Sequence, residues 1–193
     1  NQPLSNKNII LVANGEIYND PEIRARLEKY KFKTNSDSEA ITGLYFEEGI
    51  EGLKKLRGMY AFALYDKKKN RTILSRDVFG IKPLYFSKIK EGIIFSSEIR
   101  PLISLNLIEK DISNSKLLEY LELQYCSGKG TIYKNIQRIT PGELLVIEDG
   151  KISNSILQKF PEKKVSKKKI DESFIEEKLK ESVSAHLRSD VPY

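Results

Sequence analysis

Four short apolar segments follow one another between residues 59 and 95, with only turns between them. They span residues 59–65, 72–76, 84–86 and 93–95. The first is a continuous apolar run rich in aromatic residues, and the polar stretch after it ends the run. Short segments of this composition, bounded by turns, are typical of buried strands. Because no helical pattern separates them, they are expected to pair as hairpins in an antiparallel sheet.

The hexapeptide Asn-Gly-Glu-Ile-Tyr-Asn at 14–19 follows another apolar segment, 8–13, which is rich in β-branched residues. We expect segment 8–13 to be a buried strand. The next residues, Asp20 and Pro21, are expected to begin a helix, with Asp20 as its cap. The hexapeptide is therefore predicted to be a loop from a strand to a helix, a position where rigid folds often present functional groups.

Three residues of this loop carry suitable chemistry for a site. Gly15 allows a ligand to approach the main chain, and Asn14 places an amide donor beside the Gly15 N–H. The two donors together could hold a developing oxyanion. Glu16 adds a carboxylate that could accept an ammonium group. The six residues alone favour a simpler interpretation, a turn in which Asn and Gly serve only backbone geometry.

Two helices are expected between this loop and the hairpins. Residues 21–30 have apolar side chains at helical spacing. Residues 36–39, Ser-Asp-Ser-Glu, have the form of a capping box in which Ser36 is the cap and Glu39 reaches back. The helix that follows would carry its apolar side chains on one face, at Ile41, Leu44 and Tyr45. Asp37 would lie in its first turn, where the helix dipole favours a negative charge and is enough to account for an aspartate.

The rest of the chain adds three helical segments and one hairpin. Short helices are expected at 97–105 and 115–123, and a strand at 143–147 with a return strand after the Asp149–Gly150 turn. A lysine-rich stretch, 159–169, is predicted to be a solvated linker. The final helix, 170–187, has an apolar stripe at Ile170, Phe174, Leu179, Val183 and Leu187.

Composition excludes several classes of function. Cys126 is the one cysteine of 193 residues, which rules out an internal disulfide and fits a reducing cytoplasm. A single histidine rules out a multi-histidine metal or catalytic centre, and no apolar run is long enough to cross a bilayer. The net charge of +6 falls largely in the linker, where no aromatic residues are interleaved to stack bases. No nucleic-acid or membrane partner is expected.

Five motifs, taken in order, resemble the glutaminase domain of glutamine-hydrolysing asparagine synthetases, which are class II amidotransferases. They lie at residues 14–19, 36–39, 57–66, 76–85 and 95–99. Other class II amidotransferases have different residues after the Asn-Gly pair, so the hexapeptide indicates the asparagine synthetase branch. Residues 186–193 look like that family's entry into its ATP-using synthetase domain.

The resemblance implies an α+β fold, an αββα sandwich of two antiparallel sheets of the N-terminal nucleophile hydrolase type. In that family an N-terminal cysteine attacks the glutamine side-chain amide, with its own α-amine as base. A thioester forms, ammonia leaves through an internal tunnel, and water releases glutamate. By similarity, Asn14 and Gly15 form the oxyanion hole, and Glu16 and Asp37 help to bind the amino-acid end of L-glutamine. Four further residues match the family pattern, but a role in sheet and turn architecture is at least as good an interpretation for them: Arg76, Asp77, Lys82 and Glu98.

The sequence also departs from the family pattern. Asn1 stands where the family has its reactive cysteine, so we expect the sequence to begin inside the domain and the fold to be incomplete at its N-terminus. Cys126 has no free α-amine and lies in a loop-like stretch, and is expected to be an incidental thiol. His186 is expected to be exposed. The family's Ser-Gly-Gly-x-Asp-Ser pyrophosphate loop does not appear, so ATP and Mg²⁺ would belong to the synthetase domain and no cofactor is expected within this sequence.

We therefore expect a truncated glutaminase domain at 1–158, a basic linker at 159–169 and the first helix of the synthetase domain at 170–193. The predicted function is to hydrolyse glutamine and supply ammonia for the ATP-dependent amidation of aspartate, although the isolated chain is expected to be inactive. Expected partners are L-glutamine, the synthetase domain and a second copy of the chain. Two alternatives stay open: a sibling amidotransferase with a sugar or another carboxylate as acceptor, and a non-catalytic binding module.

Overall fold

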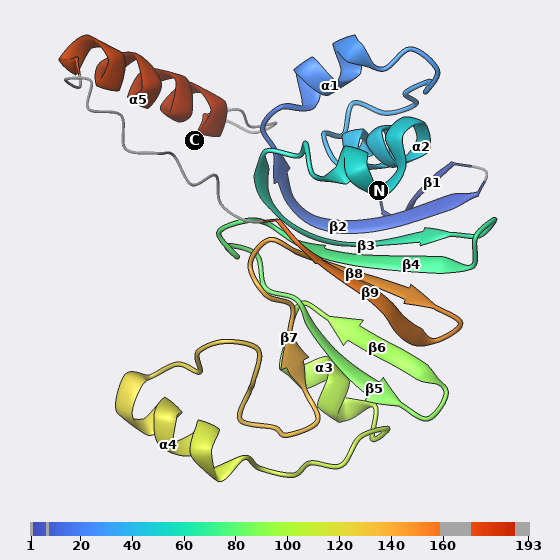
Figure 1. Ribbon diagram of the computed structural model, residues 1–193, viewed down its shortest axis with the longest axis vertical. Coiled ribbons are helices and arrows are strands. Elements are labelled where there is room, and N and C mark those ends of the chain that lie inside the picture. The colour runs from blue at the N-terminus through green and yellow to red at the C-terminus, as the bar shows by residue number, and fades with distance from the viewer. Residues whose placement is uncertain (1, 7, 159–170, 188–193) are drawn as a thin grey trace.

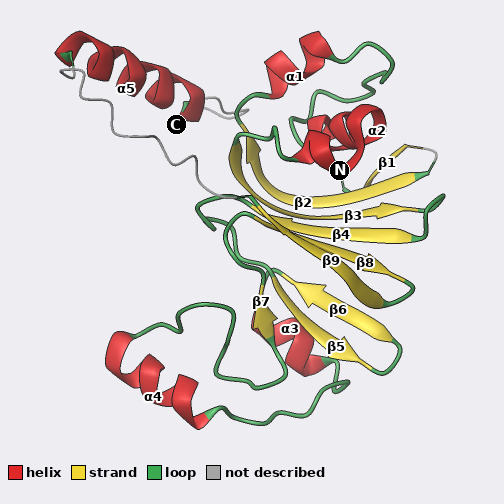
Figure 2. Ribbon diagram, viewed as in Figure 1, coloured by secondary structure: helices red, strands yellow, loops and turns green. Residues whose placement is uncertain are grey.

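Two antiparallel sheets form the middle of the molecule (Figures 1 and 2). The computed structural model describes residues 2–6, 8–158 and 171–187. Within these residues, a six-stranded sheet has the order β1-β2-β3-β4-β8-β9 and a three-stranded sheet has the order β6-β5-β7. The strands of the larger sheet are β1 Leu4–Asn6, β2 Ile9–Ile17, β3 Gly58–Asp66, β4 Arg71–Arg76, β8 Glu143–Glu148 and β9 Lys151–Leu157. Those of the smaller sheet are β5 Tyr85–Ile89, β6 Gly92–Ser96 and β7 Gln137–Arg138.

Helices cover the outer faces of both sheets. The helices α1 (Asp20–Arg26) and α2 (Glu39–Leu53) lie on the larger sheet, and α3 (Ile99–Ser104) lies on the far side of the smaller one (Figure 2). The predicted αββα sandwich is confirmed. Two further helices, α4 (Asn114–Leu123) and α5 (Glu172–His186), project from this body (Figure 1). No helix among the described residues is both long and apolar enough to span a membrane.

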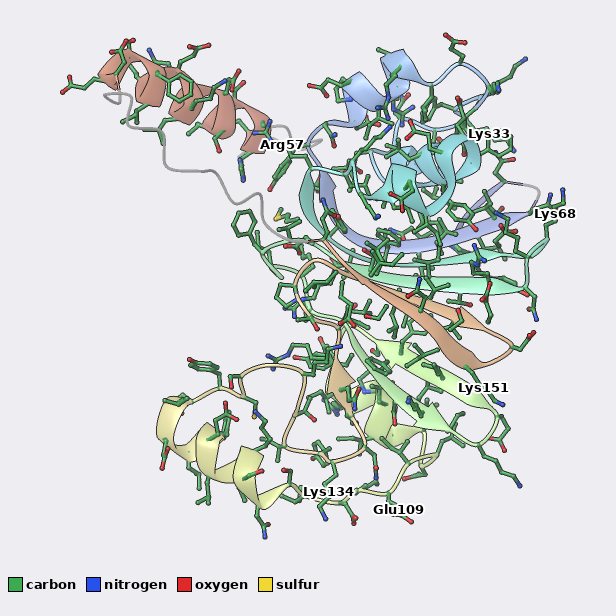
Figure 3. All side chains as sticks on the ribbon, viewed as in Figure 1. Lys33, Arg57, Lys68, Glu109, Lys134 and Lys151 are labelled. Atoms are coloured by element: carbon green, nitrogen blue, oxygen red, sulfur yellow. The ribbon has the colours of Figure 1, made fainter. Side chains whose placement is uncertain are left out.

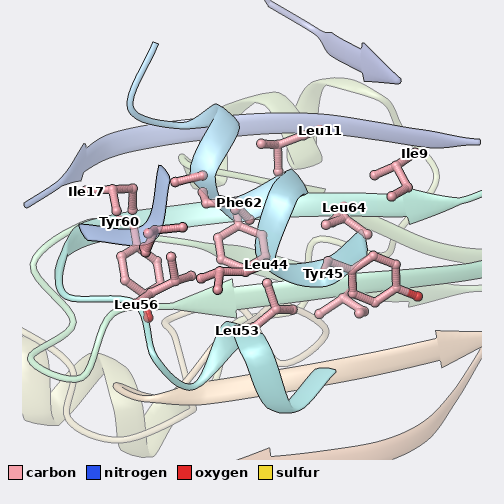
Figure 4. Close-up of a cluster of buried hydrophobic side chains, with 14 of the residues drawn as sticks. Ile9, Leu11, Ile17, Leu44, Tyr45, Leu53, Leu56, Tyr60, Phe62 and Leu64 are labelled. Carbon is pink, nitrogen blue, oxygen red and sulfur yellow. The ribbon is translucent and has the colours of Figure 1, made fainter. Parts of the chain in front are cut away.

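The central strand β3 explains why the sequence showed a continuous apolar run. Its Tyr60, Phe62 and Leu64 face α2, in a core completed by β2 side chains (Figure 4). The intervening residues, Ala61 and Ala63, face the smaller sheet and lie in a second core. A strand covered on both faces shows no alternation between apolar and polar residues. The predicted hairpins β3–β4, β5–β6 and β8–β9 are all confirmed.

Two helical predictions needed adjustment. The helix expected over 21–30 ends at Arg26, because the N–H groups of Lys29 and Tyr30 donate to the Glu47 carboxylate, each at 2.8 Å, instead of continuing the helix. The apolar stripe expected on the last helix is present, but its described members are exposed: Phe174, Leu179, Val183 and Leu187. Ile170 and the linker at 159–169 lie outside the described residues.

Candidate functional site

The strand β2 continues through most of the hexapeptide that was predicted to be a loop. Asn14, Gly15 and Glu16 pair in register with residues of β3, and the pairing extends to Ile17. The loop prediction was therefore wrong for 14–17. The Asn-Gly pair favours a turn locally, but the ladder of hydrogen bonds to a buried strand outweighs that preference.

The start of α1 also differs from the prediction. Asn19, and not Asp20, occupies the N-cap position, and Pro21 lies in the first turn as expected. The Asn19 side chain instead connects to the segment before β3: its amide donates to Lys55 O at 2.9 Å and its Oδ1 accepts from Arg57 N at 2.9 Å. Asn19 therefore ties the end of the hexapeptide to the neighbouring strand.

Gly15 is required at its position by the close approach of β3. Its φ is +148°, a conformation that residues with a side chain rarely adopt. A Cβ on Gly15 would lie 2.0 Å from Met59 O and 2.6 Å from Tyr60 Cα. Both contacts are with main-chain atoms, which cannot move without opening the β2–β3 ladder. Only glycine fits here.

The outer edge of β2 carries a row of main-chain donors. Ala13 N donates to Gln2 Oε1 at 2.7 Å, and Ile17 N donates to Asp37 Oδ2 at 2.5 Å. The direction of N–H groups alternates along a strand. The Gly15 N–H therefore points to the same edge, between the Gln2 amide and the Asp37 carboxylate. The short strand β1 ends its pairing with β2 before this stretch.

Asn14 lies on the face of β2 that is turned to the smaller sheet. Side chains alternate along a strand, and Ile9, Leu11 and Ile17 take the helix-covered face. A pocket of about 180 Å³ opens next to Asn14, with Gln2, β3 and β6 as its other walls. The sequence-predicted donors thus belong to adjacent residues of β2, with the Gly15 N–H at its outer edge and Asn14 on the face beside this pocket.

Glu16 shares the face of Asn14 and is exposed. Burial raises the pKa of Tyr18, and the nearby carboxylates of Glu16 and Asp77 raise it further. Tyr18 directly follows β2 and lies two residues beyond Glu16. The ring of His186 also reaches this position, with its centroid 4.4 Å from that of Tyr18, although His186 itself is exposed as predicted.

Asp37 reaches β2 from the long loop that joins α1 to α2. Besides its bond to Ile17 N, its Oδ1 accepts from Ser38 N at 2.7 Å. Each carboxylate oxygen offers two acceptor positions, so one N–H on each leaves capacity for a bound cation. The structure thus brings Asp37 to the strand that carries Asn14, Gly15 and Glu16.

The predicted capping box is not formed. Glu39 is buried and its carboxylate turns to the loop before Ser36, where it accepts from Lys33 N at 2.9 Å, Thr34 N at 2.7 Å, Thr34 Oγ1 at 2.7 Å and Tyr30 OH at 3.1 Å. Several donors in one loop bind this carboxylate better than a single helix-start N–H could. Glu39 consequently fixes the loop that presents Asp37.

This arrangement predicts a stability that falls in acid. Burial alone would raise the pKa of Glu39, but its hydrogen bonds from Thr34 and Lys33 outweigh that effect and lower the pKa below the ordinary 4.5. A carboxyl with a lowered folded-state pKa stabilises the fold above its unfolded pKa, and this contribution is lost as the pH falls through the folded value. The free energy of unfolding in urea is measured between pH 7 and pH 3 for the native chain and for Glu39→Gln. We expect the native chain to have the higher value at pH 7, and the difference to shrink below about pH 4.5. The matched change Glu109→Gln, at an exposed residue far from Lys33 (Figure 3), should give a difference that does not vary in this way.

Arg76 and Asp77 hold the turn that follows β4. Asp77 is fully buried, and its carboxylate accepts from the main-chain N–H groups of Tyr60, Phe79, Ile81 and Lys82. The Arg76 guanidinium donates to main-chain carbonyls of Gly80, Lys82 and Ile139. These contacts favour the architectural interpretation of both residues. Lys82 takes part through its main chain, and Glu98 is exposed at the N-cap position of α3.

Cys126 lies in the layer of the smaller sheet, past the end of α4. It is buried, and its Sγ lies 3.6 Å from Lys116 O. Nothing in its contacts links it to the edge of β2. Two residues that support this region were not predicted: Gln2, which bonds to Ala13 of β2, and Arg24, which binds the loop that presents Asp37. Gln2 gave no signal in the sequence, whereas Arg24 lies four residues after Asp20, a spacing that allows an ion pair on a helix.

Comparison with known proteins identifies the family to which this chain belongs. The family model described as glutamine amidotransferase domain matches residues 1–160, so the chain belongs to this family. It is homologous to the glutaminase part of asparagine synthetases. It is 35% identical to asparagine synthetase [glutamine-hydrolyzing] 1 of Bacillus subtilis over 99% of this chain, and 34% identical to asparagine synthetase B of Escherichia coli over 100% of it. The chain spans 31% of the length of each of these curated relatives.

A solved structure shows the same fold. Glutamine phosphoribosylpyrophosphate amidotransferase from B. subtilis superposes with a TM-score of 0.57, covering 81% of this chain and 31% of that one. The two sequences are 22% identical, so this likeness concerns the fold alone. Together with the two sheets and their covering helices, it supports an α+β sandwich fold like that of this amidotransferase.

Proposed function

We propose that the outer edge of β2 binds L-glutamine and stabilises the oxyanion formed during its hydrolysis. The observation that carries this proposal is the direction of the Gly15 N–H, which points between Gln2 and Asp37 beside the Asn14 side chain. A nucleophile that adds to the side-chain amide of glutamine places negative charge on the carbonyl oxygen. A main-chain N–H and an amide N–H at one point are donors of the kind that stabilise such a charge.

The amino-acid end of glutamine would meet the carboxylates at the end of the strand. Its ammonium group needs anionic acceptors, and Asp37 at the outer edge of β2 and Glu16 on the adjacent face of the strand would provide them. Asp37 is held in place by two N–H groups, so it need not reorganise when the ligand binds. Asn14 and Gly15 thus act on the reacting end, and Glu16 and Asp37 on the recognition end.

For the whole reaction we propose glutamine hydrolysis that supplies ammonia to aspartate, as the names of the asparagine synthetase relatives suggest. The nucleophile would be a cysteine with a free α-amine, as in the family, and not Cys126. ATP and Mg²⁺ would act in a synthetase part with which this domain cooperates. The described residues contain no group of three or more His, Cys, Asp or Glu that could hold a metal ion.

Calorimetric titration of the purified chain tests the glutamine site. We expect L-glutamine to bind with a stoichiometry of one, and D-glutamine to bind at least about tenfold more weakly. The D-isomer can place its ammonium at Asp37 and its amide carbonyl at Asn14 and Gly15 only with its α-carboxylate and α-hydrogen exchanged, so its carboxylate would lose its place in the site. Equal binding of both isomers, or no binding of L-glutamine by a chain shown to be folded by circular dichroism, would contradict the proposal.

A further inference from the structure

The loop that presents Asp37 has no regular secondary structure over 27–38. It must nevertheless hold the Asp37 carboxylate 2.5 Å from Ile17 N, at the edge of β2. A long loop of this kind keeps one conformation only if its main-chain groups find fixed partners. Those partners identify which residues outside the site determine its geometry.

The side chain of Arg24, on α1, contacts this loop at three places. Its Nη1 donates to Thr34 O at 3.0 Å and its Nη2 to Ser36 O at 2.7 Å. Its guanidinium carbon also lies 4.3 Å from the ring centroid of Phe32. The third guanidinium nitrogen, Nε, donates to Asp20 Oδ1 at 2.6 Å, which fixes the guanidinium plane on α1.

This set of contacts requires an arginine. The guanidinium is planar and directs its donors along different lines, so it can serve the Asp20 carboxylate and two carbonyls at once. A lysine could keep the charge pair with Asp20 but could not bridge Thr34 O and Ser36 O in the same way. The Arg24 side chain is 23% exposed and that of Asp20 8%, so the pair is largely shielded from solvent.

Two glutamates of α2 complete the support from the other side of the loop. Glu47 accepts from Lys29 N and Tyr30 N, and Glu39 accepts from Lys33 N and Thr34 N. Arg24 therefore binds carbonyl groups of the loop, and the two glutamates bind its N–H groups. Arg24 is the member of this set that acts next to the site, because Ser36 directly precedes Asp37.

We propose that Arg24 is a positioning residue for glutamine recognition: its contacts with Thr34 and Ser36 hold Asp37 on the Ile17 N–H, where the carboxylate meets the ammonium group of the ligand. The role in recognition rests on the proposed glutamine site. The effect on the Asp37–Ile17 hydrogen bond does not rest on it, and it can be measured in the ligand-free chain.

The test compares Arg24→Lys with Arg26→Lys, a matched change one half-turn along α1 at an arginine that pairs with Glu48. Two quantities are measured: the NMR resonance and hydrogen exchange of the Ile17 amide, and the Kd for L-glutamine. For Arg24→Lys we expect the Ile17 amide to shift towards the resonance it has in Asp37→Ala, which lacks the acceptor. We also expect its hydrogen exchange to accelerate and Kd to rise at least about tenfold. Arg26→Lys should leave both quantities at the native values.

Each outcome decides the inference. A folded Arg24→Lys chain with a native Ile17 amide overturns it, even if its melting temperature is lower, because a role only in stability would not move this resonance selectively. A shifted Ile17 amide with unchanged Kd also overturns it. If the native chain binds no glutamine, the proposed function fails; the Ile17 amide then still shows whether Arg24 positions Asp37. Should Arg24→Lys fold poorly, Asp20→Asn, which leaves Arg24 in place but removes the carboxylate that fixes its guanidinium, must produce the Ile17 shift for the inference to stand.

Discussion

Gly15→Ala is expected to destabilise the domain by at least about 3 kcal/mol, the combined result of backbone strain and overlap with β3. The new Cβ would lie 2.0 Å from Met59 O, a distance that no rotamer change can relieve. The β2–β3 ladder would have to open at the Gly15–Tyr60 pair, next to a core in which Tyr60 is buried. Urea unfolding followed by circular dichroism measures the loss.

Gly128→Ala provides a matched control for this effect. Gly128 also has a positive φ, +64°, but a Cβ there would have no neighbour within 4 Å. This variant should show only the backbone strain, about 1 kcal/mol. If Gly15→Ala lost no more stability than Gly128→Ala, the close approach of β3 to Gly15 would be refuted.

Asp37→Asn is expected to raise the Kd for L-glutamine by about 100-fold or more, because it removes the negative charge that faces the ammonium group. Asparagine has nearly the same shape, and its Oδ1 can still accept from Ile17 N, so the fold should be retained with a modest loss of stability. Calorimetry on the purified variant measures the change in affinity, and a thermal melt verifies folding.

The control for this variant is Asp111→Asn, the same substitution at an exposed aspartate that pairs with Lys134 at 3.7 Å. Asp111 and Lys134 belong to the layer of the smaller sheet, at the other end of the molecule from Lys33 (Figure 3). The control should bind glutamine as the native chain does. An Asp37→Asn chain that is folded and binds glutamine with native affinity would exclude Asp37 from the ligand site.

The sequence was most informative where local pattern and tertiary environment agree. The run over 59–65 predicted a buried strand because β3 is covered on both faces, and the turns after it predicted the hairpins. The family resemblance singled out Asn14, Gly15, Glu16 and Asp37 as candidate site residues, and the structure brings Asp37 to the strand that carries the other three.

The errors arose where a distant segment decides the conformation. Asn-Gly at 14–15 has the local preference of a turn, and only pairing with β3 makes it a strand. Glu39 has the position of a capping residue, yet donors from Lys33 and Thr34 draw it elsewhere. The contacts of Gln2 with Ala13 and of Arg24 with Ser36 join residues that no periodicity relates.

The placement of the candidate oxyanion donors on a regular strand has a consequence for how this site can change. A single residue could be inserted between residues 9 and 13 and accommodated as a β-bulge, if residues 14–17 kept their pairing with β3. If the strand instead slipped by one residue, Asn14 and Glu16 would turn into the apolar layer under α2, and the Gly15 N–H would turn towards β3. No side-chain substitution could restore the direction of the Gly15 N–H, because this donor belongs to the main chain. The effect of insertions in β2 on glutamine binding is therefore a more direct test of this main-chain donor than the effect of side-chain substitutions.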